Sequence, residues 1–149
     1  IMEILIWIVV FIATFLLMEF MAWFTHKYVM HGFLWILHKD HHRKDHRSWW
    51  ERNDLFFVFY AAISMYFFII AQFQFAVAIG AGIAGYGLAY FLVHDIFIHQ
   101  RFKLFKKANH WYAKGIRRAH KIHHKHLGKG ESECFGMLIP PLKFLKNKK

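Results

Sequence analysis

Long apolar segments alternate with shorter polar segments along this chain. Residues 1–24 are apolar apart from Glu3 and Glu19, and a second apolar run covers residues 55–98. An α-helix needs about 20 such residues to cross the hydrocarbon core of a bilayer. The first run therefore predicts one membrane span. The second run is too long for one crossing and predicts two spans that reverse direction at about residues 72–75.

The predicted fold is all-α, an integral membrane bundle of three to four transmembrane helices with a helical cytoplasmic cap. The first run lacks the basic start and the small-residue cleavage site of a signal peptide, so we expect a retained span. No Ser/Gly-rich linker divides the chain, which predicts a single membrane-embedded domain, 1–149. We expect spans at about 1–24, 55–74 and 76–98, and cytoplasmic segments at 25–54 and 99–149.

Two local features refine this arrangement. The aromatic stretch 32–37 is too short to span a membrane, so it is expected to lie at the interface or to re-enter as a fourth element. Small residues in membrane helices usually mark close helix packing. Such packing is predicted for the third span by Gly80, Gly82, Gly85 and Gly87.

The distribution of charge predicts an orientation. Hydrophobic residues make up 57% of the chain, yet 20 Lys and Arg stand against 9 Asp and Glu. The basic residues follow the first and the last predicted span, whereas the turn at 72–75 is uncharged. Cytoplasmic loops carry an excess of Lys and Arg, so both basic segments are expected in the cytoplasm of a cell whose inner membrane holds the spans. The single Cys134 excludes an internal disulfide and any CxxC motif.

Ten of the 13 histidines form two copies of one spacing pattern. In each copy a pair five residues apart is followed by a triplet at i, i+3 and i+4. Neutral imidazole is the commonest protein ligand for transition metals, and both copies lie beside predicted spans on the cytoplasmic side. The predicted metal ligands are His26, His31, His38, His41 and His42 in the first copy, and His94, His99, His120, His123 and His124 in the second.

On an ideal α-helix, the side chains of a triplet point in similar directions, whereas those of a pair do not. Positions i, i+3 and i+4 share one face of an α-helix, so each triplet can converge on a small volume. Residues five apart point roughly 140° apart on an ideal α-helix. The pairs therefore need a π-bulge, a frayed helix end or two different targets. Gly32 is a candidate stop for the helix that carries the first pair.

The number of ligands predicts two metal ions. Structural zinc takes four ligands and catalytic zinc usually three, so ten imidazoles suit two ions with about five each. Asp40, Asp45 and Asp95 lie near the histidines and either accept the second N–H of a ligating ring or are ordinary interface charges. Glu19, seven residues before His26, either helps to orient a ligand or substrate or extends toward water.

The remaining histidines, His46, His110 and His126, are left out of the ligand set because their neighbours are polar or basic. The basic tail 143–149 suits anionic lipid head groups. It could equally help to dock an acidic electron donor. Nucleic acid is not an expected partner, because the basic residues adjoin the spans and no binding motif accompanies them. The donor-docking role could be shared by Arg101, Lys103, Lys106 and Lys107.

Other classes of membrane metalloprotein fit the sequence less well. A metal-ion transporter needs polar groups along a path through the bilayer, and the predicted spans have almost none. A haem-binding electron carrier would bury facing histidines within its spans, whereas these cluster at one end. A metal-storage protein would show repetitive histidine tracts. A fixed metal centre at one membrane face is the favoured interpretation.

Four segments of the sequence resemble the histidine boxes of the bacterial β-carotene hydroxylases. This group belongs to the fatty acid hydroxylase and sterol desaturase superfamily of membrane di-iron enzymes. The resemblance extends from about Ala13 to His124, with the boxes in order and at matching separations. The segments are THKYVMHG (25–32), LHKDHH (37–42), VHDIFIHQR (93–101) and RRAHKIHH (117–124).

The resemblance implies a dioxygen-dependent monooxygenase with two non-haem iron ions held by the ten histidines. The implied reaction places a hydroxyl group at carbon 3 of each β-ionone ring of β-carotene, giving β-cryptoxanthin and then zeaxanthin. A ferredoxin-type donor would supply electrons, and the carotenoid would enter from the lipid bilayer. Zinc can replace iron at imidazole sites in a purified sample. The rival within the superfamily is a hydroxylase or desaturase acting on a fatty acyl chain or a sterol.

A carotenoid would have to reach the metals past aromatic side chains at the membrane face. Aromatic residues at such positions either line a substrate path or form an interfacial belt. The candidates for the path are Trp23, Phe24, Phe33, Trp35, Phe91 and Phe97.

Overall fold

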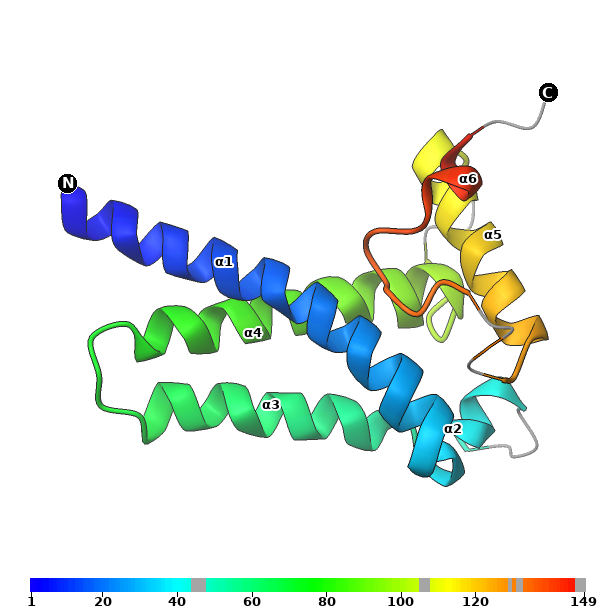
Figure 1. The fold of residues 1–149 in the computed structure, drawn as a ribbon, viewed down its shortest axis with the longest axis horizontal. Coiled ribbons are helices and arrows are strands. Elements are labelled where there is room, and N and C mark those ends of the chain that lie inside the picture. Colours follow the sequence, from blue (N-terminus) through cyan, green and yellow to red (C-terminus); the bar gives the residue numbers. More distant parts are fainter. Residues whose placement is uncertain (44–47, 105–107, 129, 131–132, 147–149) are drawn as a thin grey trace.

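The computed structural model describes residues 1–43, 48–104, 108–128, 130 and 133–146. Within these ranges all regular structure is helical, which confirms the predicted all-α class. The long helical segments lie together, and the shorter helices gather at the end opposite the N-terminus (Figure 1). Asp45 and His46, named above as a candidate partner and a rejected ligand, fall outside the described residues, as do Lys106, Lys107 and the last three residues of the basic tail.

The first helical segment is longer than the predicted span. Helix α1 (Met2–Phe24) continues without a break into the π-helix η1 (Thr25–Phe33). The segment ends at a kink, where Gly32 leaves helical geometry with φ −113° and ψ −126°. Helix α2 (Trp35–His42) follows at once. The stretch 32–37 is therefore the corner that turns the chain from the long segment into α2.

Helices α3 (Asp54–Ile69) and α4 (Ala76–Tyr90) form an antiparallel hairpin that α1 crosses at an angle (Figure 1). The hairpin reverses between Ile69 and Ala76, where the sequence predicted a turn. Helix α4 continues into a second π-helix, η2 (Phe91–Ile98). Both α1 and α3 pack against α4, so α4 is the central helix of the bundle.

Small residues allow these helices to approach closely, as the glycines of α4 predicted. A Cβ at Gly82 would lie 2.9 Å from the backbone oxygen of Phe11, and one at Gly80 would lie 3.1 Å from that of Ser64. The buried hydrophobic core between these helices contains Met18 from α1 and Ile83 and Tyr86 from α4. Ser64 donates a hydrogen bond to the Gly80 carbonyl at 2.8 Å, so the polar group in this contact is satisfied.

The outer surface of the bundle is strongly apolar. The most hydrophobic window of the segment Met2–Phe33 has only 6% of its residues buried, and that of Ala76–Ile98 has 33%. Both segments are long and apolar enough to cross a membrane, whereas α3, with 16 residues, is apolar but shorter. Exposed apolar surface of this extent marks a membrane-facing protein. The fold therefore supports membrane association.

The C-terminal part returns to the end of the bundle that carries the histidine motifs. Helix α5 (Trp111–Lys125) packs against the short helix α6 (Leu142–Leu145), and a Cβ at Gly115 would lie 2.9 Å from the Phe144 carbonyl oxygen. Residues 133–141, which have no regular structure, extend back to α1 (Figure 1). There, backbone N–H groups of Met137, Leu138 and Ile139 donate hydrogen bonds to the Glu19 carboxylate.

Candidate metal centre

Four elements bring all ten predicted histidines to one end of the bundle. The π-helix η1 carries two of them, α2 three, the end of η2 two and α5 three. Seven of the ten are buried, with exposed fractions between 0% for His123 and 8% for His31. Histidines from the first and last quarters of the chain thus share one volume.

The ring nitrogens fall into two neighbouring groups. Within each group, one ligand atom from every residue lies within 4.8 Å of all the others. His124 lies beside the second group, because its Nε2 is 2.8 Å from that of His120. The first group contains His26, His31, His38, His42 and His123, and the second contains His41, His94, His99 and His120.

Each triplet is divided between the groups rather than converging on one. On an α-helix, residues at i and i+4 differ by about 40° in direction, whereas i and i+3 differ by about 60° in the opposite sense. His38 and His42 accordingly join the first group together, while His41 points to the second. In α5, His120 and His124 stay together and His123 joins the other group.

The pairs five residues apart are accommodated by the π-helices, one of the three solutions that the spacing left open. The N–H of His99 donates to the carbonyl of His94 at 2.9 Å, which is an i to i+5 hydrogen bond. This wider turn places residues five apart on the same face. The ring centroids of His94 and His99 are 4.5 Å apart, and those of His26 and His31 are 5.2 Å apart.

In the first group the Nδ1 atoms of four of the five rings contact uncharged acceptors. His26 donates from Nδ1 to the Phe135 carbonyl at 2.9 Å, and His31 donates to the Leu127 carbonyl at 2.9 Å. Both acceptors are backbone oxygens, so the donor must be the ring. The remaining contacts of this kind join His38 to the Asn53 side-chain oxygen at 2.6 Å and His123 to the Glu133 carbonyl at 3.1 Å.

In the second group two Nδ1 atoms meet carboxylates. His41 contacts Glu51 at 2.9 Å, and His94 contacts Asp95 at 3.3 Å. Asp95 thus lies where the sequence placed a partner for a ligand ring. Glu51 was missed, because its only signal is one acidic residue in a polar stretch ten residues after His41.

For the six rings with an Nδ1 acceptor, these contacts show which nitrogen carries the lone pair. A neutral ring that donates from Nδ1 has an unprotonated Nε2. Yet the Nε2 atoms of His31 and His123 lie 3.2 Å apart, and those of His41 and His94 lie 3.1 Å apart. Two lone pairs cannot form a hydrogen bond with each other. Two nitrogen ligands of one metal ion, each about 2.0–2.1 Å from it, lie about 3 Å apart. The donor set therefore fits metal ions.

Burial keeps these rings in the form that binds metal. Desolvation lowers the pKa of His38 to about 3, with neighbouring rings contributing in the same direction. The same cause lowers the pKa of His123 to about 2 and that of His124 to about 4. Each value lies well below the ordinary value of 6.5, so these imidazoles are neutral at pH 7. Neutral imidazole is the protonation state that metal ligation requires.

Two acidic candidates from the sequence act on backbone segments. Asp40 accepts a hydrogen bond from the Arg52 backbone N–H at 2.7 Å, which fixes the segment that carries Glu51 and Asn53. Glu19 accepts from the backbone of residues 137–139 and from the Tyr86 hydroxyl at 2.7 Å. Glu19 therefore meets backbone donors and a tyrosine hydroxyl rather than a histidine ring, and it anchors the segment that supplies the Phe135 carbonyl.

Two histidines excluded from the ligand set lie at the ends of α5. His110 is exposed and caps the start of this helix, accepting a hydrogen bond from the Ala113 N–H at 3.4 Å. His126 is exposed at the residue after its last turn. Neither belongs to the two histidine groups, in agreement with their exclusion from the ligand set.

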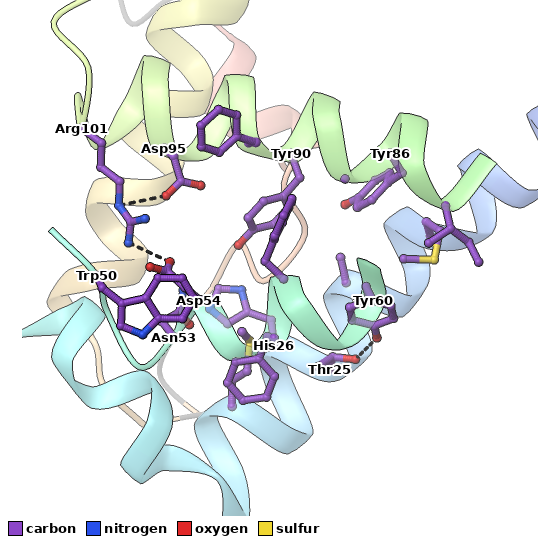
Figure 2. Close-up of a pocket in the computed structure, with 18 of the residues that line it drawn as sticks. Thr25, His26, Trp50, Asn53, Asp54, Tyr60, Tyr86, Tyr90, Asp95 and Arg101 are labelled. Carbon is purple, nitrogen blue, oxygen red and sulfur yellow. Dashed lines mark hydrogen bonds and ion pairs between the residues drawn. The ribbon is translucent and has the colours of Figure 1, made fainter. Parts of the chain in front are cut away.

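An apolar cavity of about 320 Å³ lies beside the first histidine group, between η1, α3 and α4 (Figure 2). His26 forms part of its wall, and so does Asn53, the partner of His38. Of the six aromatic candidates for a substrate path, Phe91 lines the cavity, whereas Trp35 lines a depression on the other side of His31. Most of the aromatic lining comes from residues that the sequence did not single out, namely Trp49, Trp50, Phe56, Phe57, Tyr60, Tyr86 and Tyr90.

Polar groups occupy two places in this cavity wall. The hydroxyls of Thr25 and Tyr60 are hydrogen-bonded at 2.6 Å. At the end nearest the second group, Arg101 reaches Asp95 and Asp54, while the Tyr90 ring points into the space between these ends (Figure 2). The cavity thus presents a largely hydrocarbon surface that leads to the histidines.

Comparison with known proteins identifies the family. A family model described as fatty acid hydroxylase matches residues 11–142. The chain belongs to this family. It is 35% identical to a β-carotene hydroxylase of Paracoccus sp. (strain PC1), over 91% of this chain and 85% of that protein. It is 38% identical to the β-carotene hydroxylase of Pantoea ananas, over 87% of this chain and 75% of that protein.

Plant relatives match as well. The chloroplastic β-carotene 3-hydroxylase 2 of Arabidopsis thaliana is 33% identical over 83% of this chain and 42% of that protein. No solved structure gives a significant match. The resemblance to bacterial β-carotene hydroxylases that the histidine boxes indicated is confirmed. As a member of the fatty acid hydroxylase family with these relatives, the chain is an enzyme of the hydroxylase class.

Proposed function

We propose that this protein is a membrane di-iron monooxygenase that hydroxylates carbon 3 of the β-ionone rings of β-carotene, giving β-cryptoxanthin and then zeaxanthin. The observation that carries the proposal is the set of unprotonated Nε2 atoms that face one another in two groups beside an apolar cavity. The bacterial relatives named β-carotene hydroxylases supply the substrate class.

The ten histidines would hold the two ions, and imidazole ligands suit iron as they suit zinc. When bound, iron would supply the activation of dioxygen that insertion of oxygen into an unactivated C–H bond requires, with two electrons from an external donor. The chain's own part is to hold ligand rings in one tautomer. Acceptors on Nδ1 do this for six rings, so that their Nε2 lone pairs are presented inward.

The cavity is suited to one end ring of a long hydrocarbon. Its wall is aromatic and apolar, and it ends at His26 beside the first histidine group. A ring held there would exclude water from the reacting carbon, and the aromatic side chains of Phe57 and Phe91 would orient it. The rest of an apolar polyene could remain in the bilayer.

We place the protein in the cell inner membrane with its histidines on the cytoplasmic side. The segments Met2–Phe33 and Ala76–Ile98 would cross the bilayer, and α3 would cross as the partner of α4 in the hairpin. A helix of 16 residues is about 24 Å long, which is close to the roughly 30 Å of the hydrocarbon core. The basic segments after the first and last spans support this orientation.

A ferredoxin-type protein is proposed as the electron donor. The depression beside His31 is lined by Lys39 and Arg43 as well as by Trp35. Positive charge at this place would attract an acidic donor and increase its rate of association. His31 belongs to the first histidine group, so a donor bound here would be near the metals.

The matching family model favours one rival substrate, a fatty acyl chain. A sterol would be the third choice. All three substrates are apolar and would use the same metal ligands, so the shape of the cavity decides between them. Chemical analysis of the product distinguishes them directly.

The test is expression in cells that accumulate β-carotene, followed by pigment analysis. Wild-type protein should convert β-carotene to β-cryptoxanthin and zeaxanthin. His41→Ala should abolish conversion while the protein still inserts, because it removes a buried ring of the second group. His126→Ala is the matched control, since this exposed ring follows the last turn of α5 and should leave conversion unchanged. Unaltered product from His41→Ala, or no conversion by wild type with a suitable donor present, would refute the proposal.

A further inference from the structure

The two histidine groups differ in what holds their rings. In the first group, His26, His31 and His38 donate to two backbone carbonyls and the amide of Asn53. In the second group, His41 and His94 meet the carboxylates of Glu51 and Asp95. The difference lies in the charge of the acceptor, neutral on one side and negative on the other.

Arg101 joins the two carboxylates of the second group. Its Nη2 lies 2.9 Å from Glu51 and 2.9 Å from Asp54, and its Nε lies 3.1 Å from Asp95. The Arg101 side chain is only 7% exposed. The planar guanidinium therefore fixes, at one time, the acceptor of His41 and the acceptor of His94. Arg101 touches neither ring and acts through Glu51 and Asp95.

This cluster carries more negative than positive charge. Three carboxylates, those of Glu51, Asp54 and Asp95, surround the single guanidinium of Arg101. Counting these four side chains alone, two negative charges remain uncompensated. They lie directly behind the rings of His41 and His94, in a region where burial limits screening by solvent. A divalent cation among the neutral rings of the second group would be attracted by this excess.

A carboxylate acceptor also changes the ligand itself. An imidazole that donates from Nδ1 to a carboxylate becomes a stronger base at Nε2 than one that donates to a neutral carbonyl. Losing such a partner typically lowers metal affinity 10–100-fold. Charge and ligand basicity thus act in the same direction, and both favour the second group.

We propose that the two metal sites are inequivalent, with the site formed by His41, His94, His99 and His120 binding its ion more tightly and filling first. Glu51 and Asp95 are the residues that create the difference, and Arg101 is the positioning residue that holds them. The inference rests on the metal-binding part of the proposed function, and it is independent of the substrate and of turnover.

The test is a metal titration of the purified apoprotein in detergent. Co²⁺ is added against a competing chelator, and binding is followed by its visible absorption. Wild type should bind two equivalents of Co²⁺ in two resolved steps. Glu51→Gln should weaken the tighter step about 10–100-fold and leave the weaker step in place. Arg101→Lys keeps the charge but offers one ammonium in place of a fork, and it should weaken the same step.

Asn53 provides the matched variants for the other site. Asn53→Ala removes the partner of His38 and should weaken only the second step. Asn53→Asp places a carboxylate behind His38 and should tighten that step, which brings the two affinities together. This gain of affinity requires a folded protein, so misfolding cannot produce it. Glu3→Gln, in an exposed position far from the histidines, should change neither step.

The outcomes separate the two proposals. A single step for two equivalents of Co²⁺ in wild type would overturn the inference and leave the di-metal centre standing. Equal weakening of both steps by Glu51→Gln would overturn it in the same way. If the folded apoprotein takes up no stoichiometric metal, the proposed function fails together with the inference.

Discussion

Both carboxylate oxygens of Glu19 accept the backbone N–H of Leu138, each at 3.1 Å, across a sequence separation of 119 residues. This contact joins the first helix to the segment just before α6. The same segment supplies the Phe135 carbonyl that holds His26. Glu19 is thus a link between the middle of α1 and the correct orientation of a predicted ligand.

Glu19→Gln should loosen this link. The amide keeps one oxygen, but its NH₂ group would face backbone N–H donors that now point to a carboxylate. Losing hydrogen bonds to a charged acceptor costs about 1.5–3 kcal/mol each. We expect a lower thermal unfolding temperature in detergent and a reduced metal content. Glu3→Gln is the control in the same helix, and equal stability of the two variants would show that the Glu19 contacts contribute nothing.

Gly82→Ala should separate α1 from α4. The added Cβ would lie 2.9 Å from the Phe11 backbone oxygen and 2.7 Å from the Thr14 Cβ, and backbone cannot rotate away as a side chain can. Overpacking of this kind costs typically about 1–3 kcal/mol. Gly87→Ala is the matched control on the same helix, because its Cβ would meet only a Phe57 ring atom at 3.7 Å. Thermal unfolding of both variants measures the difference, and an unchanged Gly82→Ala would contradict this packing.

Gly87→Leu should block the cavity while leaving the metal centre intact. Gly87 lines the cavity opposite Phe57, and an isobutyl group would occupy the space proposed for the substrate ring. Displacement of a reacting carbon by about 1 Å can reduce the rate roughly 100-fold. We expect zeaxanthin formation to fall by this order with metal content unchanged. Leu88→Phe, on an exposed neighbour, should keep activity. Full activity of Gly87→Leu would place the substrate elsewhere.

The apoprotein should lose stability as the pH falls below about 6.5. His38 has a pKa of about 3 in the fold, because burial disfavours its charged form, against 6.5 as its ordinary value. Between these values the unfolded chain binds more protons than the folded chain, so acidification favours unfolding. A single such histidine contributes a slope of about 1.4 kcal/mol per pH unit. Unfolding measured at pH 7.5, 6 and 5 tests this, and His38→Asn should reduce the slope by about that amount, because the other buried histidines still contribute. A wild-type stability that is constant over this range would contradict it.

The hydropathy pattern predicted the helices because each long apolar run is continuous in sequence. The reversal between α3 and α4 and the end of the first segment near Gly32 both follow from local composition. The hydropathy pattern did not predict that the span 1–24 and the helix carrying His26 and His31 form one unbroken segment. This segment continues through His26 to Phe33, because the imidazoles of η1 are buried against other histidines rather than hydrated.

The histidine spacing predicted which residues gather, but not how they divide. The i, i+3, i+4 rule states that His38, His41 and His42 share a face. Only the positions of the neighbouring helices show that His41 lies with His94 and that His38 lies with His26. Relative to residue i, residue i+4 points about 40° to one side and residue i+3 about 60° to the other. This difference assigns the rings to different groups only when two groups lie side by side.

The partners of the rings were the least predictable part of the site. The Phe135 and Leu127 acceptors are backbone carbonyls, which every residue possesses and which no side-chain pattern reveals. Glu51 and Asn53 lie two residues apart before α3, and each reaches a ring of a different group. Only the path of the chain from α2 to α3 brings them there.

The assembly of both histidine groups from the two ends of the chain has a consequence for biogenesis. During translation η1 and α2 emerge early, whereas His120, His123 and the Phe135 carbonyl follow the final apolar segment. Each group needs residues from α5, so neither coordination shell can be completed by a nascent chain that is still being inserted. Loading of the proposed metal ions would therefore be a late step, which a stalled or C-terminally clipped polypeptide could not reach.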